Sequence, residues 1–545
     1  MASNILSIAQ SALTAAQVGI GTTGHNIANA ATPGYNRQVV VQNAALAQNF
    51  GFGFIGQGTE VSTVKRIYNE YLGSQVQNAQ TAKSGLDSYY AQIRQINNLL
   101  ADPDAGLSPA LQDFFSAVQG VATDPSSVPS RQAALSSAES LAARFQSLSG
   151  QLTELERGVN TQIASSVTLI NAYADQIASL NDAIGKAQRS TGQPPNDLLD
   201  QRDQLVLELN KEIKTTVVKQ GDGAYNVFVG NGQPLVVGTS TSKLVTLASP
   251  TDPQKVVVGY KASNGSTMAI GDSSLVGGTL GGLMQFRSES LEPAKNALGR
   301  VAIGLAATFN AQHQAGFDLS GTAGGAFFNV GAPVVTAHSG NNGTATITAT
   351  VANAGALTTS DYSLSFDGAN YTLTRLADGN TTTFATFPQT IDGVQIDLTG
   401  APPVGGDSFL IRPTVQGASA FSVAITNPSD IAAADAPGAV GNNVNALALA
   451  ALQTANTLGN GTATYLGAYG QMVNEIGNKT RELEVTSAAA GTLLEQTTAT
   501  LQSESGVNLD EEATNLLRYQ QAYQAAAKVM QIAKEMFDML VSIGG

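Results

Sequence analysis

The pattern of apolar and polar positions divides the chain into helical ends and a β-rich middle. Near both ends, apolar residues recur every three or four positions, which is the period of an amphipathic helix. This spacing predicts helices over 3–18, 72–100, 131–187, 196–211, 283–316, 442–458 and 466–501. At about 1.5 Å per residue, the longest would reach roughly 80 Å unless Gly150 and Gly158 kink it.

The last stretch, 508–545, predicts a helix with two apolar stripes, although a single core needs only one. One stripe consists of Leu509, Ala513, Leu516, Tyr523, Ala527, Met530 and Phe537. The other consists of Ala522, Ala525, Val529, Ile532, Met536, Met539 and Ile543. We expect one stripe to contact the N-terminal helix of the same chain and the other to contact adjacent subunits.

The N-terminal segment is almost uncharged, with no Asp, Glu or Lys and a single Arg in residues 1–59. Leu6, Leu13 and Ile20 lie on one stripe of the predicted helix, and we expect them to meet the C-terminal helix. Glycines at 19, 21 and 24 weaken this helix, His25 to Ala31 resume it, and a turn at 32–35 ends it. A segment with so little charge is expected to need a partner.

In the middle of the chain the period shortens to that of strands. Strands are predicted at 216–219, 225–229, 234–237, 244–247 and 256–260, and then at 344–351, 362–366, 371–375, 394–398 and 409–412. Gly221-Asp222-Gly223, Asn231-Gly232 and Asp367-Gly368 supply hairpin turns.

The predicted fold class is therefore a multidomain α+β protein, with terminal coiled-coil helices and a long helical rod built from both halves of the chain. The expected terminal domain combines 1–40 with 508–545. The rod combines 41–330 with 426–507 and carries a small β region at 214–282. Residues 331–425 form an inserted β-rich domain.

The chain is acidic, with a net charge of -14, so it offers no general attraction to nucleic acid or to an anionic membrane. It contains no Cys, which excludes disulfides and thiolate chemistry. There is no run of 18 apolar residues, and the first residues lack the basic start of a Sec signal peptide. We expect no nucleic-acid or membrane partner, and any export must use another route.

The sequence signals for a catalytic, cofactor or metal site are weak. Two Gly-x-Gly-x-x-Gly matches, at 19–24 and 51–56, lack the strand-to-helix setting that a dinucleotide site needs. His25, His313 and His338 have no metal-ligand spacing, and His25 is expected to be a partly buried hydrogen-bonding residue. The cluster Asp197, Asp200, Arg202 and Asp203 is most simply a solvated face with local ion pairs. We expect no enzyme, cofactor or metal.

The two ends carry motifs that belong together. Residues 25–35 read His-Asn-Ile-Ala-Asn-Ala-Ala-Thr-Pro-Gly-Tyr, which resembles the N-terminal signature of the bacterial flagellar axial proteins of rod, hook and hook-associated type. Residues 507–513 and 519–525 are similar to the C-terminal signature of that family. Interior blocks at 198–205, 310–321 and 406–413 resemble the hook-associated proteins at the junction of hook and filament. At position 31 this chain has Ala where the family often has Asn.

The resemblance implies a non-enzymatic structural subunit that leaves the cytoplasm by flagellar type III export and forms a ring between hook and filament. It implies as partners identical subunits, the hook protein, the second hook-filament junction protein, and a cytoplasmic export chaperone at the C-terminal helix. The expected location is the flagellum, outside the cell.

The expected assembly interface comprises Leu6, Leu13, Ile20, Asn26, Asn29, Leu516, Tyr523, Val529, Met530, Met536, Phe537 and Met539. Three alternatives stay open at this stage. The chain could be a hook or distal rod subunit, a surface adhesin using 331–425, or, with least support, an enzyme.

Overall fold

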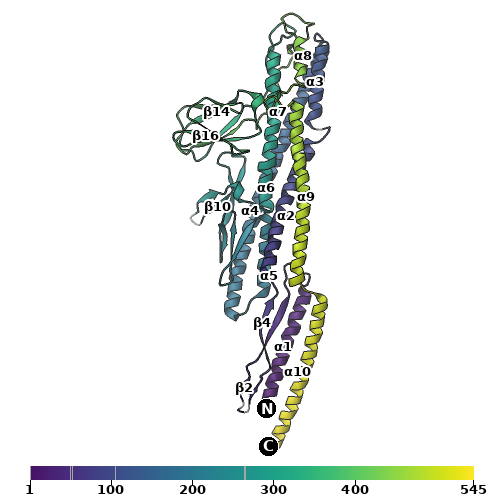
Figure 1. Cartoon of the computed structure of the whole chain (residues 1–545), viewed down its shortest axis with the longest axis vertical. Coiled ribbons are helices and arrows are strands. Elements are labelled where there is room, and N and C mark those ends of the chain that lie inside the picture. Colours follow the sequence, from purple (N-terminus) through teal and green to yellow (C-terminus); the bar gives the residue numbers. More distant parts are fainter. Residues whose placement is uncertain (1, 50, 52, 105, 263–264, 545) are drawn as a thin grey trace.

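The computed structural model describes residues 2–49, 51, 53–104, 106–262 and 265–544. A long rod of helices carries β domains on one side, and both termini lie together at one end (Figure 1). This confirms the predicted fold class.

The helices account for the whole length of the molecule. They are α1 (Ala2–Asn29), α2 (Glu70–Leu100), α3 (Leu107–Thr123), α4 (Val128–Thr191), α5 (Asn196–Glu212), α6 (Gly278–Phe286), α7 (Glu292–Gln314), α8 (Val444–Ala451), α9 (Tyr465–Ser505) and α10 (Leu509–Gly544). A single π-helical turn, Arg287–Leu291, joins α6 to α7. At about 1.5 Å per residue, the 64 residues of α4 span roughly 95 Å.

Local signals explain where α4 begins and ends. The Ser127 hydroxyl accepts a hydrogen bond from the Ser130 amide at 3.3 Å, and Pro129 stands in the first turn, where a proline costs no hydrogen bond. The helix stops at Gly192, whose φ of 68° is the left-handed conformation of a C-terminal cap. Gly150 and Gly158 do not interrupt it.

The structure corrects two helix predictions and adds one helix. The glycines at 19, 21 and 24 do not break α1, which packs along α10 as one helix. Helix α3 was not predicted, although its apolar residues have helical spacing. Helix α8 ends at Ala451 instead of 458, because Leu458 leaves the helix and fills the notch over Gly304 of α7.

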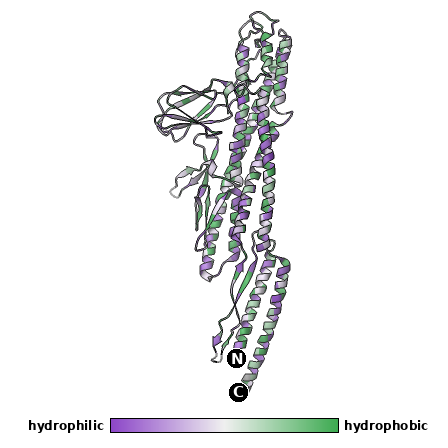
Figure 2. Cartoon of the chain, viewed as in Figure 1, coloured by the Kyte–Doolittle hydropathy of each residue, from purple (hydrophilic) through white to green (hydrophobic). Residues whose placement is uncertain are grey.

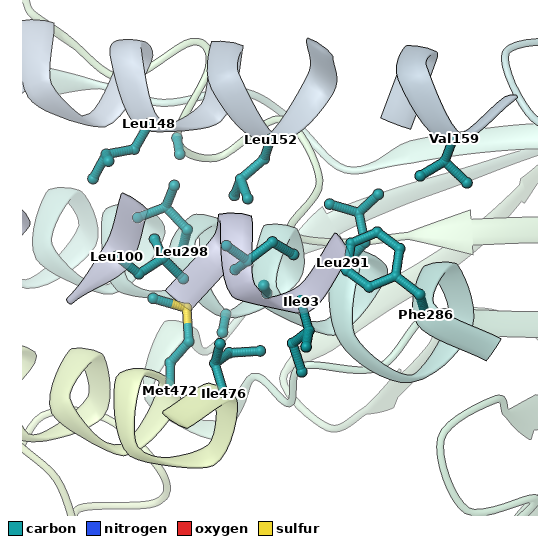
Figure 3. Close-up of a cluster of buried hydrophobic side chains, with 14 of the residues drawn as sticks. Ile93, Leu100, Leu148, Leu152, Val159, Phe286, Leu291, Leu298, Met472 and Ile476 are labelled. Atoms are coloured by element: carbon teal, nitrogen blue, oxygen red, sulfur yellow. The ribbon is translucent and has the colours of Figure 1, made fainter. Parts of the chain in front are cut away.

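Helices from both halves of the sequence share one core. Figure 3 shows side chains from α2, α4, α9 and the α6–α7 segment meeting between these helices. The labelled residues are all buried: Ile93, Leu100, Leu148, Leu152, Val159, Phe286, Leu291, Leu298, Met472 and Ile476. The hydropathy colouring in Figure 2 shows apolar positions alternating with polar ones along these helices.

The small β region contains two antiparallel sheets against α4. One has the order β5 (Thr215–Lys219), β6 (Tyr225–Val229), β7 (Gln233–Val237), β8 (Ser240–Thr241). The other has the order β11 (Thr267–Ala269), β10 (Val256–Lys261), β9 (Lys243–Ala248). Their predicted strands are confirmed within one or two residues.

The outer β domain has its own apolar core. Its five-stranded sheet runs β13 (Val334–Ala337), β20 (Ser408–Arg412), β15 (Tyr362–Phe366), β16 (Tyr371–Arg375), β17 (Thr381–Phe384). A three-stranded sheet runs β14 (Thr346–Val351), β19 (Val394–Thr399), β18 (Gln389–Ile391). A separate pair is formed by β12 (Phe328–Asn329) and β21 (Ser422–Val423). Strands β13, β17 and β18 were not predicted.

A β hairpin accompanies the terminal helices. Strand β1 (Gln38–Ala44) pairs with β4 (Thr59–Arg66), and between them β2 (Gln48–Asn49) pairs with β3 (Phe54–Ile55). Both β1 and β4 contact α1. We therefore propose that the terminal domain includes 38–66 and extends beyond the expected boundary at residue 40.

Glycine sets the distance between α2 and α6. A Cβ on Gly282 would overlap the carbonyl oxygen of Gly85, so Gly282→Ala must push the two helices apart. We expect a loss of about 1–3 kcal/mol in unfolding free energy, measured by urea denaturation. Gly150→Ala is the control, because nothing lies within 4 Å of its added methyl, and it should be neutral or stabilising. Equal stability of the two variants would contradict the close crossing.

Candidate assembly interface and joint

Helices α1 and α10 pair in antiparallel fashion along a stripe of small residues. On α1, Ala9, Ala16 and Thr23 are buried at intervals of seven. On α10, Ala526 and Ala533 are buried with the same interval. A Cβ on Gly19 would lie 2.5 Å from the Tyr519 ring, so this glycine is required by the close approach of the two helices.

The predicted interface residues lie at the edges of this stripe or away from it. Asn26 is buried, and the half-buried residues are Leu6, Leu13, Ile20, Asn29, Leu516 and Met530. The exposed residues are Tyr523, Val529, Met536, Phe537 and Met539. The contact between α1 and α10 is present as expected, but small residues form its centre, because they allow the closest backbone approach. Large apolar side chains on α10 are left without a partner in this chain.

Asn26 is the hydrogen-bonding centre of the terminal domain. Its amide nitrogen donates to the Gln38 carbonyl at 2.9 Å and to Glu512 Oε2 at 3.0 Å. Its oxygen accepts from the Tyr35 hydroxyl at 2.7 Å and from the Gln38 amide at 3.0 Å. The amide's donors and acceptor are all used, and α1, β1 and α10 are joined at one point.

The turn after α1 places the signature segment against α5. Gly34 has a φ of 77°, a conformation that favours glycine. A Cβ there would also lie 2.7 Å from the Gln204 side-chain oxygen, so the close contact requires glycine as well. His25 lies 3.2 Å from Asp197 Oδ1 and 3.2 Å from the Asn29 amide nitrogen. This agrees with the expected role of His25 as a partly buried hydrogen-bonding residue.

Asp200 holds the segment that follows the signature to the rod. Its carboxylate accepts from the Asn36 backbone amide at 3.0 Å and from the Asn36 side chain at 2.7 Å. It also accepts from Arg66 Nη1 at 2.7 Å, and the same nitrogen lies 2.7 Å from Asp203 Oδ2. The interpretation of this cluster as a solvated face is wrong for Asp200, which is 5% exposed, because residues far away in sequence cover it.

Arg202 joins α5 to α4 and to the small β region. It is fully buried, donating to the Asn181 oxygen at 3.0 Å and to the Gly223 carbonyl at 2.8 Å. Its guanidinium lies 3.5 Å from the centroid of the Tyr225 ring. The prediction that Arg202 lies on a solvated face is also wrong, because its guanidinium is buried and joins three parts of the structure.

We use the term joint for the place where the segment after α1, β4, α5 and the start of α10 meet. Burial controls the protonation of Tyr35 and Asp200 there. It raises the pKa of Tyr35 above its ordinary value, and the nearby Asp197, Asp200 and Glu512 raise it further, so the hydroxyl stays a donor to Asn26. Burial also raises the pKa of Asp200, against the opposing hydrogen bonds from Asn36 and Arg66.

The C-terminal signature closes the joint from the other side. The Arg37 amide donates to the Ser505 carbonyl at 2.8 Å, and the Arg37 side chain pairs with Glu511 at 2.5 Å. Asn508 Oδ1 accepts from the Asp510 amide at 3.0 Å, which caps the start of α10. The two terminal signatures and α5 therefore meet in one place.

Two open cavities flank His25. One, of about 610 Å³, lies between the signature turn and α4 and α5, and the other, of about 860 Å³, lies beside β4. Among the described residues, no group of three His, Asp or Glu side chains could hold a metal ion. His313 is a core residue that bonds the Gly325 carbonyl and the Ala432 amide, each at 2.9 Å.

By length and composition, one described helix is apolar enough to cross a membrane, namely α1 over Asn4–Asn29. In the structure this helix packs along α10. Near an N-terminus such a helix is weak evidence of a membrane span.

Paired terminal helices at one end of a rod with lateral β domains define a structural subunit of the flagellar axial class. The family described as "Flagellar hook-associated protein FlgK helical domain" matches residues 93–328. The "Flagellar hook-associated protein 1, D2-like domain" matches 336–413, and the "Flagellar basal body rod FlgEFG protein C-terminal" matches 501–543.

Full-length relatives agree with these matches. The chain is 40% identical to flagellar hook-associated protein 1 of Salmonella typhimurium over 99% of this chain and 100% of the relative. It is 38% identical to the Escherichia coli protein of that name, with the same coverage. A solved structure, the flagellar hook junction protein FlgK from Burkholderia pseudomallei, matches with a TM-score of 0.74 at 34% identity, covering 79% of this chain and all of that one. The chain therefore belongs to the flagellar hook-associated protein 1 family, and the alternative of a hook or distal rod subunit gives way.

Asn26→Ala is expected to weaken the terminal pair while sparing the rod. It leaves Glu512 and the Gln38 backbone without their partner, at a cost of about 1–3 kcal/mol for each buried group. Hydrogen exchange should show lost protection in α1 and α10 alone. Gln17→Ala, on the exposed side of α1, is the control. In a double-mutant cycle with Glu512→Ala, a coupling energy of zero would contradict a stabilising hydrogen bond between Asn26 and Glu512.

Arg66→Met is expected to destabilise the joint by about 3–5 kcal/mol, because buried Asp200 and half-buried Asp203 would lose their shared cation. The readout is hydrogen exchange at 36–42 and 197–203. Arg157→Met removes an exposed pair with Glu154 and should change stability by less than about 1 kcal/mol. If both variants behave alike, the joint does not depend on this ion pair.

Proposed function

We propose that this chain is a structural subunit of the junction between flagellar hook and filament, and that it self-assembles through α1 and α10 after type III export. One observation carries the proposal: α10 keeps a large apolar surface exposed although it already packs on α1. The exposed large apolar residues of α10 are Leu509, Leu517, Tyr523, Val529, Ile532, Met536, Phe537, Met539 and Val541.

The physical argument concerns the cost of leaving this surface in water. Burying one such side chain stabilises by about 1.5–3 kcal/mol, so nine of them favour association strongly. Several large apolar side chains exposed on one helix typically mark an interaction surface. Other copies of the same helix pair are suitable partners, because each brings an equivalent apolar face and a ring satisfies all of them.

The remaining partners follow from the same surface and from family membership. The ring would contact the hook protein on one side and the second hook-filament junction protein on the other. Before export, a cytoplasmic chaperone would cover α10, since its apolar residues would otherwise promote aggregation. The role is packing, without a cofactor or catalysis, and the final location is outside the cell at the flagellum.

The test uses cells that lack the chain and carry variants of it. Met536→Ser with Phe537→Ser should reduce filament attachment by at least about tenfold, because two side chains lose their burial in the assembled ring. The measurement is the fraction of cells with filaments, together with filament subunits released into the medium as monomers. Deletion of 508–545 sets the fully defective limit.

Val485→Ser is the matched control. Val485 is an exposed apolar residue on α9, within the rod, and its replacement should leave attachment unchanged. Normal filaments on cells carrying the α10 double variant would overturn assembly through this helix.

A further inference from the structure

The hairpin beside α1 carries two exposed apolar side chains. We define the arm as the described residues between Ala45 and Gly58, which include β2 and β3. Leu46 is 93% exposed and Phe54 is 75% exposed, which makes them the most exposed large apolar side chains in the described part of the chain. The whole range 38–59 contains no charged residue. An uncharged arm with two exposed large apolar side chains is typical of a contact surface.

The base of the arm is held against α1. The Thr59 amide donates to Ser11 Oγ at 3.3 Å, and Gly58 approaches Ser11 so closely that a Cβ would overlap its hydroxyl. From this level on α1 the arm extends toward the end of the molecule that holds both termini (Figure 1).

The register of the helix pair shows which part of α10 lies at the same height. Gly19 contacts Tyr519, and Asn26 contacts Glu512, seven residues further along each helix in opposite directions. Continuing this register places Ser11 opposite residue 527 or so. The arm therefore lies at the height of Val529, Ile532 and Met536, which are exposed.

The arm cannot cover these residues in its own chain. Figure 1 shows the arm and α10 on opposite sides of α1. Two unpartnered apolar surfaces on opposite sides of one subunit, at one height, are what a head-to-tail ring requires, since each copy then supplies one surface to each neighbour.

We propose that the arm of one copy docks, through Leu46 and Phe54, onto the exposed face of α10 around Ile532 in the adjacent copy. The partner is a second copy of this chain. This inference rests on the proposed assembly through α1 and α10, and it adds a specific contact and a direction around the ring.

The absence of Cys from the chain allows a direct test. Two differently tagged full-length copies, one with Phe54→Cys and one with Ile532→Cys, are expressed together, and isolated flagella are oxidised. A dimer that carries both tags is expected, at a yield at least about tenfold above that of the pair Met268→Cys with Ile532→Cys. Met268 is a matched control because it is also strongly exposed but lies on the small β region.

Leu46→Cys in place of Phe54→Cys gives a second position, should the first variant fail to form filaments. No doubly tagged dimer from either position in attached filaments would overturn the arm contact. An adduct between the arm and a different protein would overturn it as well.

Failure of the arm contact and failure of the proposed assembly through α10 would give different results. If the α10 variant Met536→Ser with Phe537→Ser loses filaments while arm cysteines do not cross-link, assembly through α10 stands and the arm contact falls. If that variant assembles normally, the proposed function falls, whatever the arm does.

Discussion

The buried hydrogen bonds between the two ends of the chain are the constraint on which the terminal domain depends. Asn26 and Glu512 are 486 positions apart, yet their side chains meet in the seam between α1 and α10. Small residues alone would let the two helices slide past each other, since one methyl group fits beside another almost equally well. A single satisfied polar contact in such a seam fixes the register, because any shift leaves a carboxylate buried without a partner. The height of the arm relative to α10 follows from that register.

A second buried polar contact fixes the terminal domain to the rod. Asp200 accepts hydrogen bonds from the segment after α1 and from β4, while Arg202, two residues on, is bound to α4 and the small β region. Helix α5 thus faces both parts of the molecule with adjacent charged residues. Open cavities lie on either side of His25 at this joint. Directional hydrogen bonds therefore help to orient the terminal helices on the rod.

The sequence predicts the periodic parts of this structure and misses what depends on distant residues. Strands β6, β15 and β16 match their predicted bounds because alternation is a local property. The break in α1 was wrongly predicted because Gly19 is a weak helix former alone, whereas its role here is to admit Tyr519. Asp200 was placed on a solvated face for a similar reason: nothing near it in sequence indicates that Asn36 and Arg66 will cover it. Two stripes on α10 were predicted, but neither contains Ala526 or Ala533, which are the buried apolar residues among those described on this helix. The face that meets α1 was missed because small residues carry a weak periodic signal.

The position of α9 and α10 at the end of the sequence has a consequence for folding. The rod core includes Met472 and Ile476 from α9, and the terminal pair needs α10, so both parts of the molecule require the last chain segment. Contacts over several hundred residues form slowly, because a long loop must close before they stabilise the fold. Until the whole chain is present, the N-terminal segment has neither partner. Its nearly uncharged helix and arm would then stay unpaired until α10 arrives, and the contact between Asn26 and Glu512 would form only once both ends are present.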